Sequence, residues 1–421
     1  MRVLIVNVHS ARNLGDDAIM QATLRGLKTA FPDVQITVAA NDPESWQRYS
    51  TIRVIGSLAT WVADPARGAW RQRALLMPVT LALLAGAALL YRLSRCRWVW
   101  GTSHQRQLLA AYYDADLVLS CGGGNFYAHR PISPALVWAL LSLGFALALR
   151  KPVVMLPQSI GPIAGSVQRL LARWVFAGAR LIMVREPRAM AFVRETLRVK
   201  TPVVLLPDLA FGLAVGMRGE TSTAPAPHPR IGVTAIDRGA QDPGFGGQSH
   251  YEQTLVALLA QLANRHEARI HIFCQSYGPS PDQDDRPVAL RLSEALRQAG
   301  VDVTLRADFR EAGELVSAYS HLDMVIGTRM HTGIFALAAG VPVLLIGYQP
   351  KACGMMTTLG LERYCCDIQD VNVSLLYDLA CEILAAEAEL RSVIRGRLAD
   401  LRARGDEWLN CLQEVLCDAS E

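Results

Sequence analysis

Short apolar runs, each followed by a polar turn and a helix-forming stretch, recur along most of the chain. Residues 2–8 form the first run, with a helix expected to about Ala30, and residues 324–326 form another. Runs without charge are typical of strands that are buried on both faces of a parallel sheet. Their alternation with helices predicts an α/β fold of doubly wound parallel sheets, in which ligands bind beyond the carboxyl ends of the strands.

The length of the chain, 421 residues, exceeds what one hydrophobic core usually supports, so we expect two domains. Residues 213–229 are rich in Thr, Ser, Ala and Pro, a composition that is typical of a linker. We therefore predict an N-terminal domain at 1–212 and a C-terminal domain at 230–421 that ends in helices.

Charge and cysteine content exclude several classes of protein. The net charge is only +4, and no aromatic-plus-basic motif appears, so nucleic acid is not an expected partner. The nine cysteines are scattered without a C-x-x-C pair, which indicates neither a zinc site nor a disulfide framework. No secretory signal precedes the first strand, so we expect a reduced, cytoplasmic location.

An insert at 57–104 interrupts the alternation, and its residues 74–91 carry no charge. The residues that border this apolar stretch are Arg67, Arg71, Arg73, Arg92, Arg95, Arg97, Trp61, Trp70, Trp98 and Trp100. An apolar core with aromatic and cationic borders is typical of a segment at a bilayer surface. The stretch is shorter than the roughly 20 residues that span a bilayer. We expect a monotopic or partly inserted helix or hairpin; the alternative is a helix buried between domains or in a dimer interface.

Arg329 and His331 are the first candidate catalytic residues. They follow the strand at 324–326 and the turn at Gly327, two positions apart, and a helix former begins directly after them. A permanent cation and a titratable imidazole at a strand end suit an anionic ligand that needs proton transfer. The alternative is that Arg329 only pairs with a carboxylate and His331 only caps the helix.

Other strand ends of the N-terminal half also carry polar residues. Asn13 and Asp16 precede the first helix, where they can cap its amides, and Asp16 can instead orient a substrate hydroxyl. Residues 122–125 place three glycines and an asparagine after a strand, a pattern that can expose amides as an anion nest. Gln158 offers a neutral donor at a further strand end.

Several charged residues allow both a structural and a functional role. Lys351 lies past the strand at 343, where it can bind phosphate or remain a surface charge, and Arg238 also follows a strand. Arg185 and Glu186 suggest a structural ion pair or an acceptor-binding pair. The acidic run 282–285 lacks calcium-loop spacing, so we interpret it as a solvated helix start.

Seven short motifs follow one another between residues 13 and 361. They are N-x-G-D (Asn13, Gly15, Asp16), G-G-G-N (Gly122 to Asn125), Q-S-I-G-P (Gln158 to Pro162), R-E (Arg185, Glu186), P-D-L-A-F (Pro207 to Phe211), G-T-R-M-H (Gly327 to His331) and G-Y-x-x-K-x-x-G with L-G-L (Gly347, Tyr348, Lys351, Gly354, Leu359 to Leu361). Together and in this order they resemble the motifs of the polysaccharide pyruvyl transferase family.

This resemblance implies two Rossmann-like domains facing a cleft, as in GT-B glycosyltransferases, with the acceptor on the N-terminal side and the donor on the C-terminal side. It implies transfer of a pyruvyl group from phosphoenolpyruvate to a pair of sugar hydroxyls. The product is a pyruvate ketal on a cell-surface polysaccharide or its lipid-linked precursor. Arg329, Met330 and His331 match the family motif that contacts phosphoenolpyruvate.

The chemistry of that reaction suggests a role for each candidate. We expect Arg329 to clamp the donor, His331 to act as acid and base, and Asp16 to orient or deprotonate the acceptor hydroxyl across the cleft. The substrate-binding candidates are Arg238, Lys351, Asn13, Gly123, Gly124, Asn125, Gln158 and Met330. No cofactor beyond the donor substrate and no metal is expected.

We expect a cytoplasmic protein that is peripheral or monotopic at the inner face of the cytoplasmic membrane, held there by residues 74–91 close to a lipid-linked acceptor. Two other functions stay open. A GT-B glycosyltransferase that takes a nucleotide sugar would use the same basic cleft, although no E-x-x-x-x-x-x-E pattern is evident in the second domain. A membrane-bound binding component with an inactive cleft would bind no ligand there.

Overall fold

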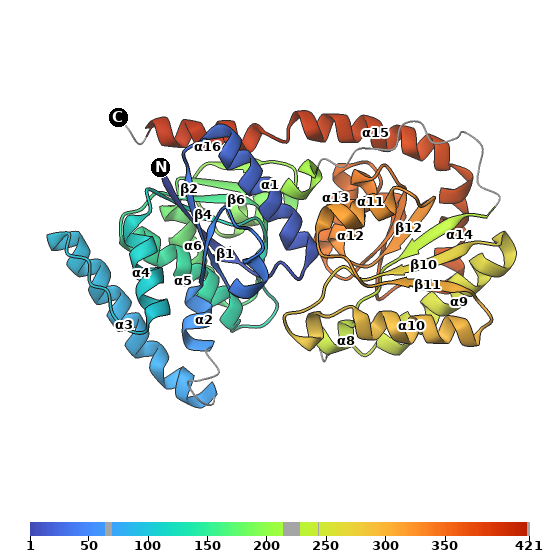
Figure 1. Cartoon of the computed structure of the whole chain (residues 1–421), viewed down its shortest axis with the longest axis horizontal. Helices are drawn as coiled ribbons and strands as arrows, with labels where there is room; N and C mark the ends of the chain where they lie inside the picture. The colour runs from blue at the N-terminus through green and yellow to red at the C-terminus, as the bar shows by residue number, and fades with distance from the viewer. Residues whose placement is uncertain (64–69, 214–227, 243, 419–421) are drawn as a thin grey trace. The chain divides into compact units, whose positions relative to one another are not determined.

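The structure is a computed structural model that describes residues 1–63, 70–213, 228–242 and 244–418 (Figure 1). The chain forms two compact units. Unit 1 consists of Met1–Ala11, Ile19–Asp208 and Asp406–Glu421, and unit 2 consists of Arg12–Ala18 and Leu209–Gly405. Helix α1 (Leu14–Ala30) therefore begins in unit 2 and continues in unit 1.

Unit 1 is built on a sheet whose strand pairs are all parallel. Its strands are β1 (Arg2–Val8), β2 (Gln35–Ala40), β3 (Arg53–Gly56), β4 (Leu117–Ser120), β5 (Gly123–Ala128), β6 (Val153–Ile163), β7 (Leu181–Val184) and β8 (Val203–Leu205). Their order is β3-β2-β1-β4-β6-β7-β8, and β5 also pairs with β6. The reversal of direction on either side of β1 and β4 makes this a doubly wound sheet.

The helices of unit 1 beyond α1 are α2 (Leu58–Ala63), α3 (Trp70–Ser94), α4 (Ser103–Asp114), α5 (Pro134–Ala148), α6 (Ser166–Gly178), α7 (Pro187–Ala191) and α16 (Glu407–Asp418). Helices α2 to α6 share one hydrophobic core with the sheet, to which Trp61, Leu84 and Leu140 contribute buried side chains. These helices therefore form a layer whose inner side covers the sheet.

Unit 2 repeats this plan with a smaller parallel sheet in the order β11-β10-β9-β12-β13-β14. Its strands are β9 (Arg230–Val233), β10 (Arg269–Phe273), β11 (Val303–Arg306), β12 (Met324–Gly327), β13 (Val343–Gly347) and β14 (Cys365–Asp367). Its helices are α8 (Arg238–Gln241), α9 (Gln248–His266), α10 (Arg286–Gln298), α11 (Ala312–Tyr319), α12 (Met330–Ala338), α13 (Pro350–Thr358), α14 (Val373–Ala385) and α15 (Glu387–Ala403). The crossover from β11 back to β12, which pairs with β9, sets the carboxyl end of β12 at the point where the strand order reverses.

The apolar runs of the sequence became buried strands. Every residue of β4, β7, β12 and β13 is buried, as expected for strands that are covered on both faces. The predicted α/β class with doubly wound parallel sheets is confirmed in both units.

The boundaries of the two units differ from the predicted ones at three places. Residues 209–212, predicted at the end of the N-terminal domain, belong to unit 2. The first-turn residues 12–18 belong to unit 2, because they pair with its loops, and the last helix, α16, belongs to unit 1, where it contacts β6. Most of the predicted linker, 214–227, lies outside the described residues.

The apolar insert forms the helices α2 and α3, with α4 at its end; α3 lies on the outer side of unit 1 beside α2 (Figure 1). Among the described residues, no helix is both long enough and apolar enough to cross a bilayer. The helix α3 continues through Pro78, although an internal proline removes one backbone hydrogen bond.

The sequence indicated no disulfide framework, and the cysteines of the described residues form a single disulfide. Cys353 of α13 and Cys365 of β14 form a disulfide, with their Cα atoms 5.5 Å apart. The two residues meet because α13 packs against β14 as the chain returns beside β13. A short strand such as β14 has no clear signal in the sequence, so this proximity was not evident.

Arg185 also has a partner that the sequence did not indicate. Its guanidinium pairs with Asp208 and donates through Nε to the hydroxyl of Ser159 at 2.9 Å, so Glu186 is not the partner in the expected ion pair. Both charged side chains are buried. Three of the sequence motifs, Q-S-I-G-P, R-E and P-D-L-A-F, thus meet in one buried network of unit 1.

We predict that Asp208→Asn destabilises unit 1 by about 3–5 kcal/mol, because the substitution leaves the buried charge of Arg185 uncompensated. Urea denaturation followed by tryptophan fluorescence measures this loss. Asp308→Asn is a matched control, since Asp308 pairs with Arg306 on the surface; it is expected to change stability by less than about 1 kcal/mol. Equal losses for the two variants would contradict the importance of the buried pair.

Candidate functional site

The G-T-R-M-H motif lies where β12 ends and α12 begins. Gly327 closes the strand, Arg329 is the N-cap residue of α12 in an extended conformation, and His331 lies in the first turn. A Cβ atom on Gly327 would lie 2.4 Å from Cγ2 of Thr332, so this position accepts only glycine without a shift. The strand-to-helix turn is therefore tight, and it delivers Arg329 and His331 together.

Hydrogen bonds among buried hydroxyl groups fix the conformation of this turn. The Thr332 hydroxyl donates to the amide oxygen of Gln275 at 2.7 Å and lies 2.9 Å from the hydroxyl of Thr234. The Thr328 hydroxyl lies 2.6 Å from the hydroxyl of Tyr251. Because all of these groups are buried, each hydrogen bond is costly to break, and the turn has little freedom to rearrange.

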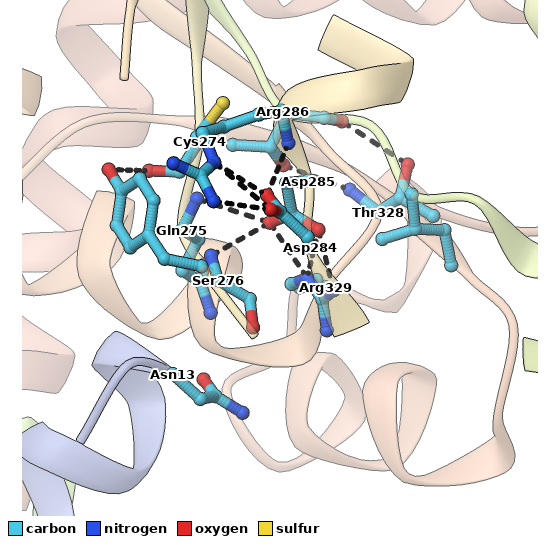
Figure 2. A network of polar contacts seen from close by, with 12 residues as sticks. Asn13, Cys274, Gln275, Ser276, Asp284, Asp285, Arg286, Thr328 and Arg329 are labelled. Carbon is cyan, nitrogen blue, oxygen red and sulfur yellow. Dashed lines mark hydrogen bonds and ion pairs between the residues drawn. The ribbon is translucent and has the colours of Figure 1, made fainter. Parts of the chain in front are cut away.

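Asp285 is the partner of Arg329 (Figure 2). The Arg329 guanidinium donates from Nε to Oδ2 at 3.0 Å and from Nη2 to Oδ1 at 2.5 Å. The backbone amides of Gln275 and Ser276 donate to the same carboxylate, at 3.1 and 2.9 Å. Asp285 is 1% exposed, so this carboxylate joins the loop after β10, the start of α10 and the Arg329 turn.

The pairing leaves part of the guanidinium for a ligand. Asp285 takes the edge formed by Nε and Nη2, and among the described residues Nη1 donates to no partner. The end of the guanidinium that carries Nη1 and the second Nη2 hydrogen can still hold a carboxylate or phosphate with two hydrogen bonds. Arg329 thus pairs with a carboxylate, as one of the two alternatives proposed. The Nη1 end of its guanidinium stays available for a ligand.

Burial disfavours the charged form of Arg329, but neighbouring negative charges favour that form by more. Desolvation alone would lower the pKa of the guanidinium. The charge of Asp285 and its hydrogen bond, with a smaller contribution from the charge of Asp16, raise that pKa above its ordinary value. Arg329 therefore remains a fixed cation, and Asp16 lies close enough to act on it.

The first turn of the chain, Arg12–Ala18, completes the site within unit 2. Asn13 forms an antiparallel bridge with Ser276, and the amide of Leu14 donates to the carbonyl of Gln275 at 3.1 Å. The buried Asp17 accepts from the amide of Ala312 at 3.1 Å, so it bonds the start of α11. Asp16 was expected across the cleft from Arg329, but it belongs to the same unit.

His331 packs directly against this first turn. A Cβ atom on Gly15 would lie 2.4 Å from Nδ1 of His331, and the imidazole is half-buried. The side chain of Asn13 accepts from the amide of Gly15 at 3.0 Å, which fixes the backbone beside the ring. The N-x-G-D motif and the G-T-R-M-H motif are therefore in contact, although more than 300 positions separate them in the sequence.

Further cationic groups extend the site along the end of the sheet. Arg238 lies at the start of α8, pairs with Asp242 at 2.8 Å and covers the ring of Tyr348 at 5.4 Å. Lys351 is half-buried in the first turn of α13, three residues after Tyr348. Met330 is buried in the first turn of α12. Arg238 and Tyr348 are thus in contact.

Cys274 lies beside this network but does not suit nucleophilic catalysis (Figure 2). Burial, followed by the charges of Asp285 and Asp284, raises the pKa of its thiol to about 12. The thiol is therefore neutral near pH 7, and a neutral thiol is a poor nucleophile. No three His, Cys, Asp or Glu side chains gather into a group that could hold a metal ion in the described part of the chain.

The remaining candidates lie in unit 1. Gly123, Gly124 and Asn125 begin strand β5 instead of an open anion nest, and Gly123 pairs with Gln158 of β6. The Asn125 side chain donates to the carbonyl of Asn7 at 2.8 Å, which supports the end of β1. Gln158 is fully buried, and in the described residues neither atom of its amide has a hydrogen-bond partner.

The sequence did not reveal Asp285, Gln275 or Thr332 as site residues. The run 282–285 was interpreted as a solvated helix start, which is wrong for Asp285 because that carboxylate is buried against Arg329. The available signal was position: Gln275 and Ser276 follow a strand of the same sheet as Arg329. Asp285 itself is the N-cap residue of α10, a position that does not distinguish a buried carboxylate from a solvated one.

Solved structures with a similar fold support the architecture. The sucrose-phosphate synthase of Thermosynechococcus elongatus aligns over 100% of both chains with a TM-score of 0.59 and 16% identity. The UDP-GlcNAc 2-epimerase of Neisseria meningitidis, bound to UDP-GlcNAc, aligns over 98% of this chain and 100% of its own, with a TM-score of 0.58 and 12% identity. At these identities the likeness concerns the fold alone, which is the GT-B-like class predicted from the motifs.

Sequence comparison is more specific. The amylovoran biosynthesis protein AmsJ of Erwinia amylovora is 23% identical over 390 residues, covering 88% of this chain and 89% of its own. The family model described as polysaccharide pyruvyl transferase matches residues 13–350, a span that begins at Asn13 and includes Arg329 and His331. Since this match covers most of the chain, the protein belongs to the polysaccharide pyruvyl transferase family.

Proposed function

We propose that this protein transfers a pyruvyl group from phosphoenolpyruvate to two hydroxyls of a sugar, forming a ketal on a polysaccharide or its lipid-linked precursor. The observation that carries the proposal is the joint delivery of Arg329 and His331 by one tight turn, against Gly15 and within reach of the charge of Asp16. Membership of the family supports the polysaccharide as the acceptor class.

The donor would be held by its two anionic groups. The free fork of Arg329 suits the planar carboxylate of phosphoenolpyruvate, since two parallel hydrogen bonds fix its orientation. The phosphate would bind near Lys351 and the amides at the start of α13, with Arg238 contributing positive charge beside Tyr348. The cations beyond Arg329 are needed because Asp285 already neutralises one guanidinium.

His331 would move the proton that starts the reaction. It donates a proton to C3 of phosphoenolpyruvate, the C2–C3 double bond supplies the electron pair, and C2 becomes cation-like. The first sugar hydroxyl adds to C2 and loses its proton to the imidazole, which restores the acid. The C2–O bond to phosphate then breaks, and the second hydroxyl closes the ketal while its proton leaves with phosphate.

Asp16 would act on the acceptor. As a carboxylate near Arg329, it can accept a hydrogen bond from the first sugar hydroxyl and increase the nucleophilicity of its oxygen. Asn13 lies in the same turn and offers an amide for a second hydroxyl. This arrangement brings donor and acceptor groups from Arg12–Ala18 and α12 into one unit.

A nucleotide-sugar transferase is the second candidate, because the similar solved structures include the epimerase bound to UDP-GlcNAc. Isothermal titration calorimetry separates the two donors. We expect heat of binding with phosphoenolpyruvate and none with UDP-sugars or dTDP-sugars. Binding of a nucleotide sugar without binding of phosphoenolpyruvate would replace the proposal by the glycosyltransferase.

The direct test is turnover. The protein is incubated with phosphoenolpyruvate and a set of lipid-linked or free oligosaccharides, and phosphate release is followed together with the mass of the sugar product. A pyruvate ketal adds about 70 Da, because pyruvic acid joins with loss of one water; this follows from the bond changes of the proposed step. Phosphate release without this product would indicate hydrolysis rather than transfer.

We predict that His331→Ala and Arg329→Lys each lower kcat/KM by about 10²–10⁴-fold. The first loses the proton donor, and the second loses both the fork and the geometry of the pair with Asp285. The surface variants His321→Ala and Arg395→Lys are matched controls, since both residues are exposed in unit 2. Full activity of His331→Ala would remove His331 from the proposed chemistry.

We predict that Gly15→Ala lowers kcat about 100-fold while the protein stays folded, because the new methyl group displaces the imidazole by an ångström or more. Gly396→Ala is the matched control, as a Cβ atom there meets nothing within 4 Å. The readouts are steady-state kinetics with phosphoenolpyruvate and thermal melting. Wild-type kinetics for Gly15→Ala would show that the ring position is not set by this glycine.

A further inference from the structure

The charge of the chain is unevenly distributed. Residues 65–185 contain 14 Lys and Arg but only two acidic residues, Asp114 and Asp116, which gives +12. The rest of the chain has 28 basic and 36 acidic residues, which gives −8. The small net charge of the whole protein conceals this separation, and the basic segment includes helices α3 to α6 of unit 1.

Helix α3 has an outer face without charge over four turns. Its inner face packs into the core through Leu84, Ala87 and Ala88. At 100° per residue, the opposite face carries Val79, Leu89, Leu90 and Leu93, and all four are exposed, Leu89 at 58% and Leu93 at 78%. Exposed leucines on one stripe are costly in water, and no described element covers them.

Arginines border this stripe. Arg92 donates to the carbonyls of Ala148 and Leu147 at the end of α5, at 2.6 and 3.3 Å, which anchors α3 against α5. Arg95 and Arg97 follow and are exposed, with Trp98 partly exposed beside them. An apolar stripe that ends in arginine and tryptophan matches the polarity profile of a bilayer interface.

Helix α6 extends the surface on the other side of α5. Its exposed residues Val167, Leu170 and Trp174 follow one another at helical spacing, with Arg173 between them. Trp174 lies against Gly144 of α5: a Cβ atom on Gly144 would be 3.2 Å from the indole ring of Trp174. Helices α3 and α6 therefore flank α5 in one layer.

We propose that the outer side of α3 and α6, which we call the basic-apolar face, docks unit 1 onto a bilayer that contains anionic phospholipids. The leucines and tryptophans enter the interfacial region, and the arginines contact the headgroups. This proposal goes beyond the transfer reaction and is independent of it, since its readout is vesicle binding.

Charge complementarity favours a bilayer over a second copy of the chain. Two such faces would bring exposed arginines such as Arg95 and Arg173 of one copy against those of the other, and like charges in contact oppose association. An anionic bilayer instead offers negatively charged headgroups to the arginines and an apolar region to the leucines and tryptophans. The test is therefore vesicle flotation of the full-length protein with phosphatidylcholine alone and with about 30% phosphatidylglycerol added.

We predict binding to the anionic vesicles that weakens at high salt, and little binding to phosphatidylcholine. Leu89→Glu with Leu93→Glu should weaken binding more than about tenfold. Arg95→Gln with Arg173→Gln should weaken binding about fivefold for each arginine. Leu290→Glu is the matched control, because Leu290 is 57% exposed on α10 of unit 2; it should bind like the parent protein.

Thermal melting checks that the variants are folded, and analytical ultracentrifugation reports self-association. The proposal would be overturned if the parent protein and the Leu89→Glu/Leu93→Glu double variant bound vesicles equally. It would also be overturned if vesicles with and without phosphatidylglycerol bound the parent protein equally. A dimer that this double variant disrupts, without any vesicle binding, would assign the face to a second copy instead. Loss of vesicle binding with unchanged turnover on a soluble acceptor would separate this result from the proposed function.

Discussion

The buried pair of Asp285 and Arg329 is the interaction on which the site depends. Burying either charge alone would cost several kcal/mol, so each is tolerated only with the other in place. The carboxylate also satisfies two backbone amides of the loop after β10. That loop in turn bonds the first turn of the chain, so three distant segments are positioned by one carboxylate.

Because its two charges cancel, the same pair reduces the electrostatic attraction of the site for an anionic ligand. Asp285 cancels the guanidinium charge, and Asp16 adds a negative charge nearby. In the proposed function, the affinity for phosphoenolpyruvate would then come from Arg238, Lys351 and the amino ends of α12 and α13. The role proposed for Arg329 would accordingly be orientation more than attraction, because it would align the planar carboxylate of the donor for reaction at the adjacent carbon.

The sequence allowed prediction where a local pattern determines the structure. It did not allow prediction where contacts between distant segments determine it. Arg329, His331 and Arg238 could be placed at strand ends, because parallel strands end at one edge of a sheet. Asp285 could not, since an acidic run before a helix has the same pattern whether it is solvated or buried. The pairing of Arg185 with Asp208 and the place of residues 12–18 in unit 2 likewise depend on contacts between distant segments.

The separation of charge along the chain has a consequence for orientation at a membrane. A protein that is basic throughout would bind an anionic bilayer in many poses, because every face is attracted. Here the basic residues are concentrated in residues 65–185, and the remaining −8 is repelled by the same lipids. For the proposed docking, this separation favours the poses in which α3 and α6 of unit 1 face the lipid. The residues proposed to bind the donor, Arg329 and Lys351, belong to unit 2, whereas the proposed docking face belongs to unit 1. The two proposals therefore assign the two anionic ligands, donor and phospholipid, to different residues.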